Sequence, residues 1–266
     1  MTRPLLLCLI ILLLSAGVQG FRLPHASGSP LNHKGLSSWR NTIPTGGEEP
    51  LPKSPPTAGL AQRIWIAAGE GDIATLRLLL QEAQGRPEML NWQDEYGYTP
   101  LCVGCFYGRV DVVRLLTSTQ GVELNRGDNG GMTPLHAACF FGRLEVVAVL
   151  LDVPGIVEKV NVVDNYGFSA CHYAAREGYA DIVQALSAVP VTDLNLRDTE
   201  VGWTALMVGV FNCRIEVVRV LQYEEKCDVQ ARANRGGWSE GMNAQDLAMR
   251  EGYVDIADML RATKRG

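Results

Sequence analysis

Two cysteines set three residues apart are the side chains of this 266-residue chain whose spacing most directly suggests chemistry. Cys102 and Cys105 form a Cys-x-x-Cys motif, which suits a redox-active dithiol or one half of a zinc site. A structural zinc site needs four ligands, and no second motif of this kind completes the set. We therefore predict no metal here and keep thiol-based regulation as an alternative function.

Two of the four histidines form the other candidate site. His136 and His172 are both followed by a run of small or aromatic residues, and imidazoles at matching positions can bind a metal ion. Their recurrence is equally explained by an internal repeat, so we assign no metal and no cofactor. Nothing in the chain resembles a nucleophile elbow, a P-loop, a dinucleotide-binding loop or paired catalytic carboxylates, and we predict that the protein is not an enzyme.

The segments that must position these residues repeat along the chain. Residues 133–151 read TPLHAACFFGRLEVVAVLL, and copies of this frame begin at Gln62, Thr99, Thr133, Ser169, Thr204 and Asn243. A glycine stands nine residues after the start in five of the six copies, at Gly71, Gly108, Gly142, Gly178 and Gly252. Glycine reaches positive φ without a steric penalty, which suits a turn between two antiparallel helices. Cys213 takes this place in the fifth copy and departs from the pattern.

A similar loop precedes the first helix in each of copies two to five. Aspartates open it at Asp94, Asp128, Asp164 and Asp198, and glycines close it at Gly97, Gly131, Gly167 and Gly202. Aspartate can accept hydrogen bonds from amides of its own turn, and glycine relieves crowding at the end of the turn. Asparagines lie a few positions earlier, at Asn91, Asn125, Asn161 and Asn195, where we expect a side chain tolerant of left-handed geometry.

These landmarks agree in register, and together they resemble the ankyrin repeat, a β-turn finger followed by two helices. Thr133, Pro134, Leu135 and His136 match the family's diagnostic tetrapeptide. The resemblance covers residues 61–266 and implies an all-α repeat solenoid of about six ankyrin repeats. It also implies that His136 and His172 bond across to neighbouring turns, and it makes Cys102 and Cys105 buried residues of a first helix. Paired alanines such as Ala174 and Ala175 then lie where helices approach closely.

The first sixty residues differ from the rest. Residues 1–20 combine Arg3, an apolar block from Leu5 to Leu14 and a small-residue exit, which predicts a cleavable signal peptide too short to span a bilayer. Residues 21–60 are rich in Pro, Ser and Gly, and we expect a disordered leader. This leader is either a plain linker of a secreted protein or the transit segment of a secondary-plastid alga. We slightly favour the plastid because Phe21 directly follows the expected cut.

Charge narrows the choice of partner. Residues 1–60 hold five basic and two acidic residues and carry +3, whereas the whole chain carries −5, which leaves −8 on residues 61–266. An acidic domain without a basic stripe is a poor candidate for binding nucleic acid or an anionic membrane surface. We therefore expect another protein or peptide as the partner, no membrane span in the mature chain, and a monomer.

The resemblance places partner binding on the concave side, at finger tips and at the outward positions of the first helix. In copies two to five, ten of the twenty residues at those positions are aromatic, against 7% of the chain. The predicted partner-binding residues are Tyr96, Tyr98, Phe106, Tyr107, Phe140, Phe141, Tyr166, Phe168, Trp203 and Phe211. Aromatic side chains supply contact area at low rotamer cost and dominate binding hot spots.

These observations predict a non-enzymatic scaffold that binds a partner polypeptide on an aromatic-rich concave face. Three alternatives remain open: a plastid targeting factor or chaperone for apolar client segments, a secreted effector, and a thiol-based regulator that uses Cys102 and Cys105. For Phe168 and Trp203, packing along the solenoid is an alternative to partner binding.

Overall fold

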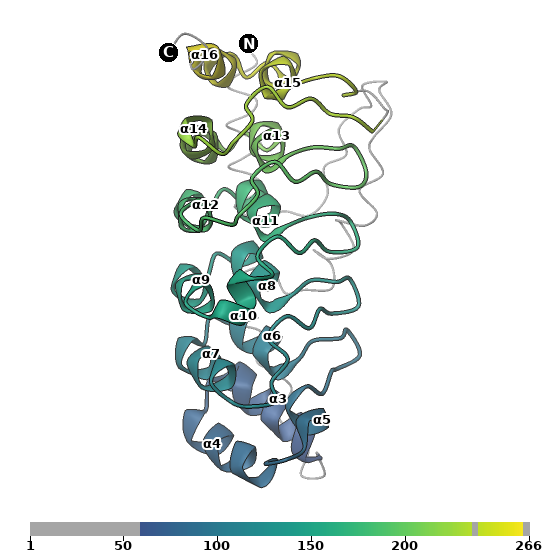
Figure 1. The fold of residues 1–266 in the computed structure, drawn as a ribbon, viewed down its shortest axis with the longest axis vertical. Coiled ribbons are helices and arrows are strands. Elements are labelled where there is room, and N and C mark those ends of the chain that lie inside the picture. Colours follow the sequence, from purple (N-terminus) through teal and green to yellow (C-terminus); the bar gives the residue numbers. More distant parts are fainter. Residues whose placement is uncertain (1–58, 236–238, 263–266) are drawn as a thin grey trace, which may run out of the picture. The chain divides into compact units, whose positions relative to one another are not determined.

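Six copies of a helix pair make up the repeat domain. The computed structural model describes residues 59–235 and 239–262, and within these ranges all regular elements are helices (Figure 1). The first helices of the copies are α3 (Leu60–Glu70), α6 (Pro100–Phe106), α8 (Pro134–Phe140), α11 (Ala170–Glu177), α13 (Ala205–Phe211) and α15 (Ala244–Glu251). The second helices are α4 (Ile73–Glu82), α7 (Val110–Thr117), α9 (Leu144–Leu151), α12 (Ala180–Ser187), α14 (Ile215–Tyr223) and α16 (Val254–Ala262). The predicted all-α repeat solenoid is confirmed.

The copies stack in register. First helices form one row and second helices a parallel row, while the finger loops project to the other side of the first helices (Figure 1). Two single-turn helices, α5 (Pro87–Leu90) and α10 (Pro154–Val157), lie in the connections before the second and fourth copies. None of the helices in the described ranges has the length and apolar character needed to cross a membrane.

First helices begin where the sequence places their caps. The Thr99 hydroxyl accepts a hydrogen bond from the amide of Cys102, and Pro100 fills the first helical position, where its missing N–H costs nothing. In α8 and α11 the cap is reciprocal, because a histidine three residues later accepts a hydrogen bond from the amide of the capping residue. The Thr-Pro-Leu-His pattern thus sets the start of the helix.

The turns between paired helices have the left-handed geometry that the glycines predict. Gly108, Gly142 and Gly178 have φ of 71°, 67° and 93°. Cys213 adopts the same conformation, with φ of 55°, and it is the one described non-glycine residue with positive φ. The fifth turn therefore keeps the shape of the others despite its side chain.

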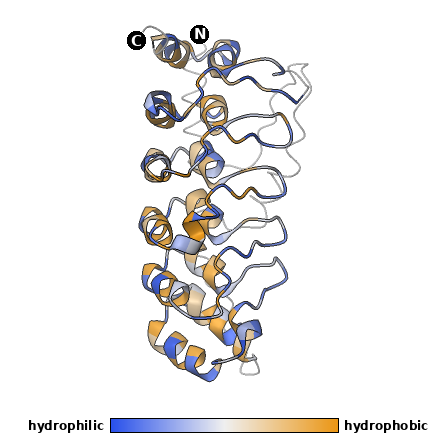
Figure 2. Ribbon diagram, in the orientation of Figure 1, coloured by the Kyte–Doolittle hydropathy of each residue, from blue (hydrophilic) through white to orange (hydrophobic). Residues whose placement is uncertain are grey.

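Small and aliphatic side chains form one continuous core between the two rows of helices. Val146, Val147 and Leu150 of α9 are at most 1% exposed, and Ala174 and Ala175 of α11 are fully buried. The hydrophobic colouring gathers on the helices, whereas the finger loops are mainly polar (Figure 2). The alanines are where the sequence predicts a close approach, because α11 packs against both α8 and α13.

Each finger is closed by its aspartate and then bonds to the next finger. The Oδ1 atom of Asp94 accepts hydrogen bonds from the amides of Tyr96 and Tyr98, as predicted for this loop. The amide of Asn129 donates to the Tyr96 carbonyl of the preceding finger at 3.1 Å. A Cβ atom on Gly97 would lie 2.6 Å from that same amide, so glycine is required for close approach as well as for its φ of 87°.

The asparagines before the fingers have a different role from the predicted one. They do not adopt left-handed geometry, and that interpretation was wrong. Their side chains instead bridge to the following copy: Asn161 Nδ2 donates to the Val191 carbonyl at 2.7 Å, and Asn161 Oδ1 accepts from the Asp193 amide at 2.8 Å. An amide has a donor and an acceptor on one planar group, which suits such a two-way bridge.

The predicted signal peptide, residues 1–20, lies outside the described residues. The predicted disordered or transit-like leader, residues 21–60, also lies outside them, except for Gly59 and Leu60. Gly59 is the N-cap of α3, and Leu60 is its first residue.

Candidate functional site

The Cys-x-x-Cys motif is buried in the first helix of copy two. Cys102 and Cys105 are 1% and 0% exposed, and burial raises the pKa of both thiols. A raised pKa disfavours the thiolate that redox exchange or metal binding requires. Among the described residues all six cysteines are free, and no group of three or more His, Cys, Asp or Glu side chains could hold a metal. The motif is therefore part of the core.

The two histidines serve as helix caps. In each, Nδ1 accepts from the backbone amide of the capping residue, Thr133 or Ser169. His172 Nε2 also lies 3.1 Å from the Trp203 carbonyl of the next copy, as the ankyrin resemblance implies. Burial lowers the pKa of both imidazoles, to about 4 for His136, so they are neutral at pH 7. His172 therefore links copy four to copy five, whereas the Nε2 atom of His136 is buried without a hydrogen-bond partner, so the cross-repeat bond implied for His136 is not present.

Rings from the fingers and the first helices meet along copies two and three. Tyr96 and Tyr98 have ring centroids 6.1 Å apart, and Tyr98 lies 6.5 Å from Phe106. Phe106 packs on Phe141 of the next copy at 4.1 Å. Tyr107 and Phe140 each contact one of these phenylalanines at 4.6 Å. We call these six residues the aromatic patch: Tyr96, Tyr98, Phe106, Tyr107, Phe140 and Phe141.

The patch remains open to solvent along its length. Tyr96 is 44% exposed, and the other five rings are partly exposed. The patch therefore combines mutual packing with an uncovered apolar surface, which fixes the rings without hiding them.

Two of the four remaining predicted partner-binding residues are buried. Phe168 and Trp203 are only 8% and 6% exposed and belong to the core, so their rings do not form part of an exposed stripe. The reason is local: each precedes a first helix and packs on a ring of its own copy, Tyr173 or Phe211. Tyr166 and Phe211 are partly buried against the core, as Tyr98 and Phe140 of the patch are. Phe168 and Trp203 are thus the two of the ten predicted residues that are buried.

Arg176 lies at the C-terminal end of the patch. The Arg176 guanidinium lies 4.8 Å from the centroid of the Phe140 ring and 5.2 Å from that of Tyr173. Its Nε atom is 2.8 Å from Glu177, in an ion pair whose two side chains are 14% and 20% exposed. The aromatic patch is therefore bordered at copy four by the Arg176–Glu177 ion pair.

Carboxylates follow the finger side of the patch. Asp128 is 8% exposed, its Oδ1 accepts from two amides of its finger, and its Oδ2 is buried without a hydrogen-bond partner. Burial, with the like charges of Asp164 and Asp94 in addition, raises the pKa of Asp128 to about 6. The Tyr173 hydroxyl donates to the matching Oδ2 of Asp164. We call Asp94, Asp128, Asp164 and Asp198 the aspartate row.

Arginines follow the opposite side, at the turns between paired helices. Arg109 Nε donates to the Gly69 carbonyl, Arg143 Nε to the Phe106 carbonyl and Arg214 Nε to the Arg176 carbonyl, at 2.9–3.0 Å. We call these three residues the arginine row. This row was not predicted, although an arginine directly after the turn residue of copies two, three and five is a visible signal in the sequence.

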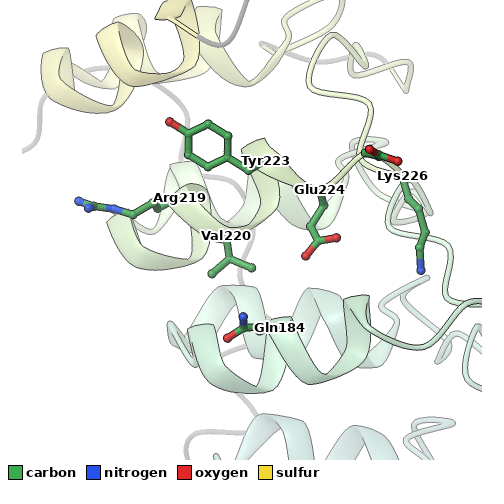
Figure 3. A pocket seen from close by; sticks show the side chains of 7 residues that line it. Gln184, Arg219, Val220, Tyr223, Glu224 and Lys226 are labelled. Carbon is green, nitrogen blue, oxygen red and sulfur yellow. The ribbon is translucent and has the colours of Figure 1, made fainter. Parts of the chain in front are cut away.

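An open pocket of about 450 Å³ lies on the other side of the first helices, between α12 and α14. Its lining mixes charges of both signs with apolar groups: Gln184, Arg219, Val220, Tyr223, Glu224, Glu225 and Lys226 (Figure 3). It contains none of the predicted site residues.

Comparison with known proteins agrees with this geometry. A family model described as "Ankyrin repeats (3 copies)" matches residues 64–157, 121–198 and 155–233. The crystal structure of the ankyrin repeat domain of Bcl-3, described as a unique member of the IkappaB protein family, is similar with a TM-score of 0.68 and 23% identity. The match covers 76% of this chain and 85% of that one. No curated protein matches the chain. Ankyrin repeats form scaffolds for protein–protein interaction, and this chain belongs to the ankyrin-repeat family.

Proposed function

We propose that the protein is a non-enzymatic scaffold that binds an apolar or aromatic segment of another polypeptide on the aromatic patch. The observation that carries the proposal is the unbroken series of ring contacts from Tyr96 to Phe141, which stays partly exposed across two repeats. A contiguous apolar surface of this kind marks an interaction site more often than an idle face.

Mutual packing also prepares the patch for binding. The Phe106 ring contacts both Phe141 and Tyr107, so little rotamer freedom is left to lose when a partner docks. The tyrosines also carry hydroxyl groups, which can form hydrogen bonds to a bound main chain.

The test is a triple variant, Tyr96→Ala, Tyr107→Ala and Phe141→Ala, compared with the natural chain in partner capture. We expect capture to be lost and the far-ultraviolet circular dichroism to be unchanged. Tyr223→Ala is the matched control, because Tyr223 is a 73% exposed aromatic residue on α14, away from the patch. Full capture by the triple variant would refute the proposal. Since Phe141 packs on Phe106, the single variant Tyr96→Ala provides a milder version whose folding is not at risk.

The place of action is a separate proposal. We propose that residues 1–20 direct the chain into the secretory pathway and that residues 21–60 direct it onward to a secondary plastid, where it acts as a monomeric targeting factor or chaperone for apolar client segments. The second candidate is a secreted effector. Residues 1–60 fused to a fluorescent protein separate the two by where the fusion accumulates: plastid fluorescence supports the first, and fluorescence in the medium supports the second.

A further inference from the structure

The finger loops bond to one another in one direction along the stack (Figure 1). In copy three the amide of Asn129 donates to the carbonyl of Tyr96 in the preceding finger, at 3.1 Å. The finger of copy four bonds to that of copy three in the same way at 3.0 Å, and the finger of copy five bonds to that of copy four at 2.9 Å. In all three the donor is the residue directly after the finger aspartate. One main-chain amide thus attaches each of these fingers to the finger before it.

The finger of copy two is the first described finger of this series, and its equivalent amide is free. The residue after Asp94 is Glu95, and in the described part of the chain its N–H donates to no carbonyl or side chain. The Oδ1 atom of Asp94 accepts from the amides of Tyr96 and Tyr98, and Asp128 makes the same pair of bonds in the next finger. Because the two fingers share this internal geometry, the Glu95 N–H is directed toward the N-terminal end of the stack.

The side chain at this position also differs from its equivalents in the next two fingers. The Nδ2 atom of Asn129 donates to the Glu95 carbonyl at 2.9 Å, and the Nδ2 atom of Asn165 donates to the Asn129 carbonyl at 3.2 Å. An ionised glutamate has no hydrogen to donate, so Glu95 cannot form this second bond to a preceding segment. The free edge therefore offers one directed donor, the main-chain N–H, next to Tyr96, which is 44% exposed.

We propose that the segment bound on the aromatic patch is extended, and that one of its main-chain carbonyls accepts a hydrogen bond from the Glu95 amide as a further finger would. This inference rests on the proposed function and specifies the backbone conformation of the partner. An extended segment has free carbonyls along its edge and presents alternate side chains to one face, where they can pack on Tyr96 and Tyr98. The carbonyls inside a helix are already used by the helix, so a helical segment cannot complete this bond.

Proline at position 95 removes the donor and suits the finger. The Gly97 amide donates to the Asp94 carbonyl at 3.0 Å, which makes Glu95 the second residue of a four-residue turn. Aspartate at the first position, proline at the second and glycine at the fourth are preferred in the commonest type of such a turn. We therefore expect Glu95→Pro to leave the melting temperature unchanged. Glu95→Ala is the matched control, because it removes the same side chain and keeps the N–H.

Two synthetic peptides test the proposal against the immobilised full chain. One has about ten residues that alternate Thr and Phe, and the other has about 18 residues and forms a helix with a Leu- and Phe-rich stripe. Both carry terminal lysines for solubility. We expect the alternating peptide to bind Glu95→Pro about two- to tenfold more weakly than Glu95→Ala, which is the loss that one hydrogen bond accounts for. The helical peptide should bind the two variants equally.

Hydrogen exchange of the Glu95 amide reports on the bond directly. We expect this amide to exchange rapidly in the free chain and more slowly when the alternating peptide is bound, because a hydrogen-bonded amide is protected. Slow exchange in the free chain would show that another segment of the chain or a second copy already accepts the bond, and this result would overturn the inference. Self-association of the full chain that Glu95→Pro abolishes would overturn it as well.

The outcomes separate this inference from the proposed function. If the alternating peptide does not bind, or binds both Glu95 variants equally, the extended conformation is refuted, and the proposed function is still decided by partner capture with the triple patch variant. If the peptides bind and the triple patch variant binds them as well as the natural chain does, the proposed function itself fails.

Discussion

Single residues in this domain show how the repeat pattern tolerates exceptions. The turn between α13 and α14 requires left-handed backbone geometry, and Cys213 provides it although a Cβ atom makes that conformation unfavourable by about 1–2 kcal/mol. Its side chain is exposed, so the cost comes from the backbone and is not caused by packing. The position therefore keeps a strain that the other five turns avoid with glycine.

Replacing this cysteine by glycine should stabilise the domain. We expect Cys213→Gly to raise the free energy of unfolding by about 0.5–1 kcal/mol, because relief of the strained φ exceeds the added entropy of the unfolded chain. Urea denaturation measures the change. Cys213→Ala keeps the Cβ atom and should give no such gain. A loss of stability in the glycine variant would show that the thiol contributes more than the backbone costs.

Asp128 makes stability depend on pH. Its pKa is about 6 in the folded chain and near the ordinary value of 3.8 when unfolded, so the folded chain holds the proton more tightly between these values. Its contribution to folding is therefore largest below pH 4 and declines as the pH rises through 6. We expect Asp128→Asn to remove this part of the decline between pH 4 and 7.

The measurement is the unfolding free energy of the natural chain and of Asp128→Asn at pH 4, 5, 6 and 7. The asparagine amide imposes a constant cost at the buried Oδ2 position, so only the slope is informative. Parallel curves for the two proteins would contradict the raised pKa.

At the scale of elements, the close approach of the first helices limits the size of the side chains that fit between them. Helix α11 lies between α8 and α13, and Ala174 and Ala175 are fully buried at this junction. The connections between copies are directional: the asparagines before the fingers of copies two to five bond forward to the next copy, and the arginines after the turns of copies two, three and five bond back to the previous one. Packing and these bonds fix the register together.

Enlarging an alanine at the junction should therefore separate the copies. We expect Ala174→Leu to lower the free energy of unfolding by about 1–3 kcal/mol, because the added side chain has no space between the helices. Thermal melting followed by circular dichroism measures the effect. Ala148→Leu is the control, since Ala148 is exposed on α9 and its replacement should change stability little. An unchanged melting temperature for Ala174→Leu would remove the packing argument.

At the scale of the whole repeat domain, the landmarks that depend on local geometry were predictable from the sequence. Thr133 caps a helix, Gly108 turns one and Asp94 closes a finger through atoms only a few residues away, so their spacing carries the information. The number of copies and their order followed from these landmarks. The role of Asn161 was misjudged because its hydrogen-bond partners lie about 30 residues further along the chain.

The sequence by itself determined the family, the register of the repeats and the presence of an aromatic-rich set of outward positions, because a short repeat encodes its own caps and turns. Only the tertiary structure decided which of those rings face solvent. Phe168 and Trp203 are covered by neighbouring side chains of their copies, whereas the rings of copies two and three stay partly open.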